Sequence, residues 1–155
     1  MTSQELLGSL AYAFKEDPFA IKFIRQIFYV SELWDDLIDK DKDRSNNEIT
    51  DAFRMALCEL PMNPFYRANI GVLGPVIQNV CIAYDVANQI EAGDSKRKEV
   101  AFWLRNGIFL IILTCIDIIG GPDWVREAGV KFIQKTWGNY DRVFSIFKKE
   151  VGSND

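Results

Sequence analysis

Apolar residues recur along almost the whole chain at intervals of three and four positions, which is the spacing of one face of an α-helix. No segment shows the sustained alternation of apolar and polar residues that is typical of a half-buried strand, and no two such segments flank a hairpin turn. We therefore expect an all-α fold. The pattern predicts a single helical domain over residues 1–155, built as a bundle of six or seven helices around a central apolar helix, with residues 150–155 frayed.

Capping residues, glycines and prolines divide this pattern into separate helices. The expected helices cover about Ser3–Lys15, Pro18–Lys40, Glu48–Leu60, Ile70 or Pro75 to Ala92, Lys96–Ile119, Asp123–Trp137 and Tyr140–Lys149. The Lys96–Ile119 helix contains the most apolar run of the chain and is expected at the centre of the bundle. In the Glu48–Leu60 helix, the spacing places Phe53 and Leu57 toward the core.

The composition excludes several classes of protein. The formal net charge of −4 gives no support for wrapping nucleic acid, so no nucleic-acid partner is expected. The chain has no histidine, which excludes Ser-His-Asp and Cys-His nucleophiles and histidine-ligated metal sites. Its three cysteines lack metal-binding spacing and favour a cytoplasmic location. Arg105, Asn106 and Asp117 interrupt the most apolar run, so we expect no membrane span.

Four acidic residues share one side of the expected Pro18–Lys40 helix, namely Glu32, Asp35, Asp36 and Asp39. Their i, i+3, i+4 and i+7 spacing brings like charges together, so a positive group should neutralise them. Mg²⁺ prefers hard oxygen ligands and can bridge carboxylates to a phosphate. The acidic residues therefore predict a Mg²⁺ site.

The sequence Asp35-Asp36-Leu37-Ile38-Asp39 resembles the D-D-x-x-D motif of class I isoprenoid synthases, all-α enzymes that bind prenyl diphosphates through Mg²⁺. The resemblance implies that Asp35 and Asp39 chelate the metal. Those enzymes carry a second metal motif on a facing helix. The best match to it here is Asp85 with Asn88, one helical turn apart.

The pairs Glu32-x-x-Asp35 and Asp85-x-x-Asn88 also resemble the acidic motifs of all-α nucleotide pyrophosphohydrolases of the MazG and dimeric dUTPase type. These short proteins bind Mg²⁺ between adjacent helices. This resemblance implies that Glu32, Asp35, Asp36 and Asp85 lie around the metal.

Both resemblances lead to one predicted chemistry, the metal-dependent binding, hydrolysis or transfer of a small diphosphate-containing molecule. Without histidine, a carboxylate has to orient the attacking water, so Glu32 and Asp36 are the predicted catalytic residues. Arg67 and Arg105 are the predicted phosphate-binding residues. The predicted metal ligands are Asp35, Asp36, Asp39, Asp85 and Asn88.

Three alternatives stay open. The acidic side of the helix can be a solvated helix end paired with Lys40, Lys42 and Arg44, and Arg105 can lie on the bundle surface. At the level of function, the alternative is a non-enzymatic, acidic helical interaction protein of the kind that a phage encodes, binding a host or virion protein. The partner is then a protein rather than a small phosphorylated molecule, and a homodimer is a further option.

Overall fold

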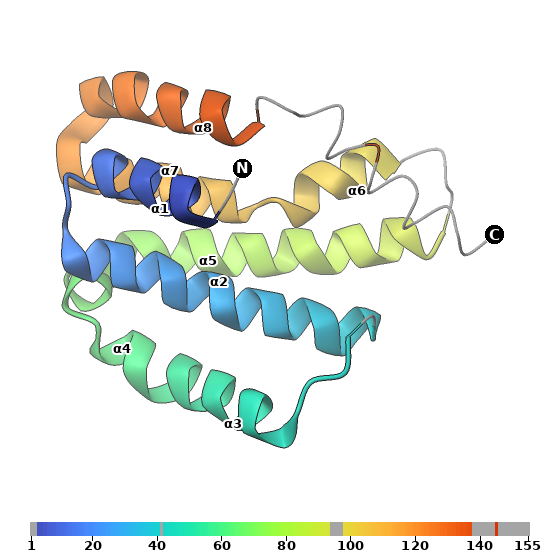
Figure 1. The fold of residues 1–155 in the computed structure, drawn as a ribbon. Coiled ribbons are helices and arrows are strands. Elements are labelled where there is room, and N and C mark those ends of the chain that lie inside the picture. Colours follow the sequence, from blue (N-terminus) through green and yellow to red (C-terminus); the bar gives the residue numbers. More distant parts are fainter. Residues whose placement is uncertain (1–2, 41, 94–97, 138–144, 146–155) are drawn as a thin grey trace.

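The computed structural model describes residues 3–40, 42–93, 98–137 and 145. Among these residues all regular secondary structure is helical, as Figure 1 shows, and no strand is present. The predicted all-α fold is therefore confirmed.

The helical elements follow one another with few connecting residues. They are α1 (Ser3–Ala13), α2 (Pro18–Asp39), α3 (Asn46–Arg54), a π-helical turn (Met55–Glu59), α4 (Leu60–Met62), α5 (Pro64–Glu91), α6 (Lys98–Arg105), α7 (Ile108–Trp124), a second π-helical turn (Val125–Gly129) and α8 (Val130–Trp137).

Over the described residues these elements form five helical segments, so the predicted count of six or seven is wrong. The difference arises because α6, α7 and α8 follow each other as one segment, whereas the sequence pattern separates Lys96–Ile119 from Asp123–Trp137. The predicted Tyr140–Lys149 helix and the frayed residues 150–155 fall outside the described residues, apart from Ser145.

The orientation predicted for two residues of the Glu48–Leu60 segment is wrong. Phe53 and Leu57 were expected in the core, yet both are exposed, Leu57 by 72%. Leu57 lies in the π-helical turn, which holds one residue more than an α turn and so changes the direction of its side chains around the helix axis. Ala52 is buried in α3, and Leu60, which the same spacing places inward, is buried as expected.

The core lies between α1, α2, α5, α7 and α8. Fully buried apolar residues from α1, α2, α5 and α7 meet there, including Phe14, Phe23, Leu73 and Ile112. In Figure 1, α5 runs between α2 on one side and α6 and α7 on the other, and it packs against all three. The Lys96–Ile119 segment, expected at the centre, supplies four of the most buried core residues from α7, namely Ile111, Ile112, Cys115 and Ile116.

The chain reverses direction at Gly121, where φ is +75° and ψ is −177°. This combination is open almost only to glycine, and Pro122 then starts the next turn with a φ suited to a helix. The reversal returns α8 to α1, as Figure 1 shows. Trp124 fixes the contact, because its indole Nε1 donates a 2.8 Å hydrogen bond to the Ala13 carbonyl.

Two helical stretches of the described chain, Pro64–Glu91 and Lys98–Thr136, have the length and composition of a membrane span. The core helices of soluble proteins meet the same criteria, so this finding is weak support for a span. The sequence-based expectation of no membrane span stays a prediction.

The capping residues of α2 fix where the helix begins and where its acidic C-terminal end stops. Asp17 begins the helix by accepting hydrogen bonds from the backbone N–H groups of Phe19 and Ala20. Lys40 ends it in the left-handed conformation, with φ at +57°. The acidic last two turns of α2 thereby meet the last turn of α5, the end of α6 and the start of α3.

Candidate functional site

The acidic side chains of α2 divide into two ion-pair clusters, each organised by an arginine. In the Arg105 cluster, Arg105 contacts Asp35, Asp39 and Glu91, and Tyr84 joins through Asp35. In the Arg44 cluster, Arg44 and Lys42 contact Glu32 and Asp36, and Arg44 also contacts Glu48.

The Arg105 cluster ties α2, α5 and α6 together. The guanidinium binds Glu91 with two hydrogen bonds, from Nε at 2.6 Å and from Nη2 at 2.7 Å, which is the forked geometry that suits a carboxylate. Its Nη1 donates to Asp35 Oδ1 at 2.7 Å, and the Tyr84 hydroxyl donates to the same oxygen at 2.5 Å. The Arg105 side chain is only 16% exposed, so this is a largely desolvated charge held by three carboxylates.

Burial and charge shift the pKa values in this cluster. Burial raises the pKa of Asp39, and the nearby Asp35 and Glu91 carboxylates add to the rise, so that the opposing effect of Arg105 is outweighed. Burial also raises the pKa of Tyr84, together with its hydrogen bond to Asp35. For Arg105, burial by itself lowers the pKa. The hydrogen bonds and charges of the carboxylates raise the pKa by more than burial lowers it, so the guanidinium stays charged.

The Arg44 cluster joins the end of α2 to the start of α3. Asp36 is the buried member, with its side chain only 4% exposed. It accepts a hydrogen bond from Arg44 Nε at 2.5 Å, and Lys42 lies 3.8 Å away. Glu32 is mostly exposed and contacts both cations. A buried carboxylate requires such a partner, so Arg44 provides the compensation for Asp36.

Glu48 connects this cluster to the capping box of α3. The Ser45 side chain accepts a hydrogen bond from the Glu48 N–H, and Glu48 Oε2 accepts from the Ser45 N–H at 2.8 Å. The same carboxylate contacts Arg44 at 3.1 Å. The backbone N–H of Ser45, its hydroxyl and Arg44 all favour the charged form, and they lower the pKa of Glu48 to about 2.

The other predicted site residues lie apart from these clusters. Arg67 and Arg105 were expected to bind one phosphate, but Arg67 is exposed in the first turn of α5, at the opposite end of that element from the Glu91 that Arg105 binds. Asp85 is exposed and joins neither cluster among the described residues. Asn88 is partly buried, and its Oδ1 accepts no hydrogen bond from any described group.

Two of the five predicted metal ligands, Asp35 and Asp39, are brought together, but both face Arg105. Asp36 lies in the other cluster, with Arg44. Within the described chain, no group of three or more cysteine, aspartate or glutamate side chains has an arrangement that could hold a metal ion. The carboxylates of both clusters form ion pairs that join α2 to neighbouring elements.

Sequence reasoning missed Tyr84 and Glu91 as partners of Asp35 and Arg105. Both lie on α5 within one turn of the proposed ligand Asn88, so the helix was identified but the side chains on its packed face were not. The pairing of acidic residues with Lys42 and Arg44 was among the open alternatives, and the structure contains it.

A second candidate site lies on the surface of α6 and α7. Trp103 on α6 and Leu110 on α7 are both 57% exposed. One turn beyond Leu110, an open pocket of about 390 Å³ is lined by α7 and the segment that follows its reversal. The lining residues are Leu113, Thr114, Asp117, Pro122, Val125 and Arg126.

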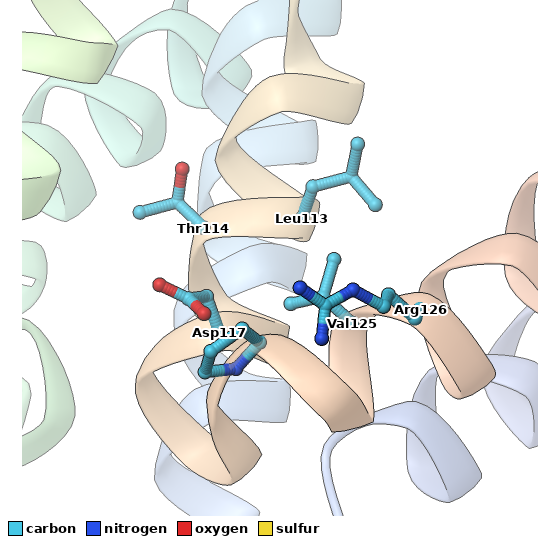
Figure 2. Close-up of a pocket in the computed structure, with 6 residues that line it drawn as sticks. Leu113, Thr114, Asp117, Val125 and Arg126 are labelled. Atoms are coloured by element: carbon cyan, nitrogen blue, oxygen red, sulfur yellow. The ribbon is translucent and has the colours of Figure 1, made fainter.

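The pocket is lined by both apolar and charged side chains. Figure 2 shows Thr114 and Asp117 on one side and Leu113, Val125 and Arg126 on the other. Asp117 and Arg126 are both exposed, and Arg126 pairs with Asp123 at 2.5 Å. Apolar surface with a polar rim is the arrangement typical of a protein-binding site. We call Trp103, Leu110 and this pocket the α7 face.

Comparison of the chain with models of protein families, with curated proteins and with solved structures finds no match.

Proposed function

We propose that this protein is a non-enzymatic helical module that binds another protein through the α7 face. The observation that supports this most strongly is the exposure of Trp103 on α6 and Leu110 on α7, with an open pocket one helical turn beyond Leu110. Tryptophan is among the residues that contribute most to binding energy at protein interfaces. A large exposed apolar surface bordered by charged groups is uncommon on a protein without a partner.

The charged residues favour a binding module over an enzyme. A catalytic carboxylate needs access to substrate, yet Asp36 is buried against Arg44, and Asp35 accepts hydrogen bonds from Arg105 and Tyr84. These contacts give the acidic residues a structural role. The ion pairs of Arg105 fix α6, which carries part of the α7 face, against α2 and α5.

Photocrosslinking followed by affinity measurement tests this proposal. A photoreactive amino acid in place of Trp103 should crosslink a defined protein in an extract of the native cells, and that protein is then purified. We expect Leu110→Ala to weaken its binding to the unlabelled protein by about tenfold or more, as at an interface hot spot.

Leu57→Ala is the matched control, because it removes the same side chain from an exposed position on the first π-helical turn. It should leave the affinity unchanged. Equal affinity of the wild type and Leu110→Ala, or an equal loss in Leu57→Ala, would contradict binding through the α7 face.

The Mg²⁺-dependent diphosphate chemistry stays a second candidate because of one observation. Asp35, Asp39 and Glu91 place three carboxylates around a single guanidinium, so the Arg105 cluster carries excess negative charge. A cation could replace or supplement Arg105 there. The response of the melting temperature to Mg²⁺ separates the two functions.

A further inference from the structure

The pocket of the α7 face contains a carboxylate whose charge is not compensated. Asp117 is exposed and lines the pocket, and it is the only charged residue between Arg105 and Asp123. Within the part of the chain that the structure describes, its side chain forms no ion pair or hydrogen bond. Arg126, the other charged residue of the lining, is already paired with Asp123 at 2.5 Å. The pocket therefore carries an excess negative charge.

The exposed side of α7 brings apolar side chains and this carboxylate together. Leu110, Leu113 and Asp117 are spaced i, i+3 and i+7, and all three precede the break at Gly121. Leu113 and Asp117 are one turn apart, so their side chains are neighbours separated by roughly 6 Å. The buried residues of the helix occupy the other side, namely Ile111, Ile112, Cys115 and Ile116. A partner that lies along this side of α7 meets apolar surface and Asp117 at once.

A close approach of two elements forms the apolar wall of the pocket. A Cβ added at Gly129 would lie 3.0 Å from Leu113 Cδ2 and 3.4 Å from Val125 Cγ1. The absence of a side chain at Gly129 therefore lets the second π-helical turn pack against α7. Val125 is thereby held close to Leu113, and together they offer an apolar side chain a place to bind one turn away from Asp117 (Figure 2).

A purely apolar partner does not suit this pocket. It would remove water from Asp117 without replacing the lost hydrogen bonds, which is costly for a charged group. A basic side chain in the partner compensates that cost. Arginine suits the position best, because its guanidinium can donate two hydrogen bonds to one carboxylate while its aliphatic stem covers apolar surface.

We propose that the partner of the α7 face is a basic peptide segment of another protein, which places an apolar side chain against Leu113 and Val125 and an arginine or lysine on Asp117. This inference rests on the proposed function and specifies the chemistry of the partner. The sign of the charge disfavours nucleic acids and anionic bilayers, because both would bring phosphates to Asp117.

Selection from a phage-displayed library of random peptides, on the purified full-length protein, tests the inference. We expect the enriched peptides to contain an arginine or lysine within four positions of a large apolar residue. Fluorescence anisotropy then measures the affinity of a synthetic copy of the most enriched peptide. Asp117→Asn should weaken its binding by about tenfold or more, since the substitution removes the charge but keeps the size of the side chain.

Asp43→Asn is the matched control. It removes the same charge from an exposed position in the connection between α2 and α3, so it should leave the affinity unchanged. Circular dichroism on each variant reports whether it is folded.

A charge reversal tests for direct contact. Asp117→Arg should abolish binding of the basic peptide, because like charges then face each other. A peptide in which glutamate replaces the basic residue should bind this variant and not the wild type. Such a rescue cannot arise from misfolding.

Enriched peptides without a basic residue would overturn the inference, as would equal affinities of the wild type and Asp117→Asn or a charge reversal that fails to rescue binding. The proposed function fails separately, if Leu110→Ala leaves the affinity for the crosslinked protein unchanged. A crosslinked protein whose binding requires Leu110 but not Asp117 would overturn only the inference and would leave binding through the α7 face in place.

Discussion

Arg105 supplies the positive charge that the clustered carboxylates of α2 and α5 require. Its forked contact with Glu91 and its bond to Asp35 are charge-assisted and partly shielded from water. We expect Arg105→Met to lower the free energy of unfolding by about 2 kcal/mol, because the carboxylates are left without their partner. Urea denaturation measures this change.

Arg25→Met serves as the control, since Arg25 is an exposed arginine on α2. Its effect should stay within about 0.5 kcal/mol. An equal effect of the two substitutions would mean that the Arg105 cluster contributes nothing specific to stability.

The same variant tests the magnesium prediction. Millimolar Mg²⁺ should leave the melting temperature of the wild type unchanged, since Arg105 already neutralises Asp35 and Asp39, and should raise it in Arg105→Met. A Mg²⁺-dependent rise in the wild type, lost in Asp35→Ala, would favour the diphosphate chemistry over the binding module.

At the level of single elements, the cap of α3 makes stability depend on pH. The pKa of Glu48 is about 2 in the folded protein and about 4.5 when the group is free of its partners. The folded state therefore gains stability from the charged Glu48 above pH 4.5 and loses it as the pH falls toward 2. In Glu48→Gln this part of the pH dependence should disappear.

Denaturation series at several pH values measure the effect. The difference in unfolding free energy between the wild type and Glu48→Gln should be constant near neutral pH and shrink below about pH 4.5. Glu16→Gln, at an exposed position, provides the comparison. A difference that does not change with pH would show that the Glu48 charge does not stabilise the cap.

The reversal between α7 and α8 depends on a small residue before it. A Cβ at Gly120 would overlap the side chain of Trp124, which holds α1 through Ala13. Gly120→Ala should therefore lower the unfolding free energy by about 2 kcal/mol, the cost of overpacking. Thermal and urea denaturation both measure it.

Gly8→Ala is the control for this substitution. Gly8 also lies in a helix, but an added Cβ there meets nothing within 4 Å. It should be neutral or stabilising, because alanine favours the helix. Destabilisation by both substitutions to the same extent would contradict a specific role for the Gly120–Trp124 contact.

Across the whole molecule, local sequence patterns predict the helices. They do not predict which side chains meet at the candidate site. The start of α2 at Pro18 and the chain reversal at Gly121 depend on residues with strong local preferences, so the sequence predicts them closely. The orientation of Leu57 was predicted incorrectly because this residue lies in a π turn, which changes the helical phase without a clear sequence signal.

The partners of the acidic residues could not be predicted for a related reason. Asp35 meets Tyr84 and Arg105, which are 49 and 70 residues away in the chain. Helical periodicity identifies which residues share one helix, but it contains no information on which faces of two helices meet. The acidic side of α2 therefore indicated a need for positive charge, and only the packing identified arginine as its source.

The contact between Ala13 and Trp124 has a consequence for how the chain folds as it leaves the ribosome. The two residues are 111 positions apart, so α1 is made well before the segment that it contacts. At a synthesis rate of roughly 10 residues per second, α1 waits about 10 s for the segment that covers it. α1 is thus translated long before Trp124, and a nascent chain that stalls between the two leaves α1 without this contact.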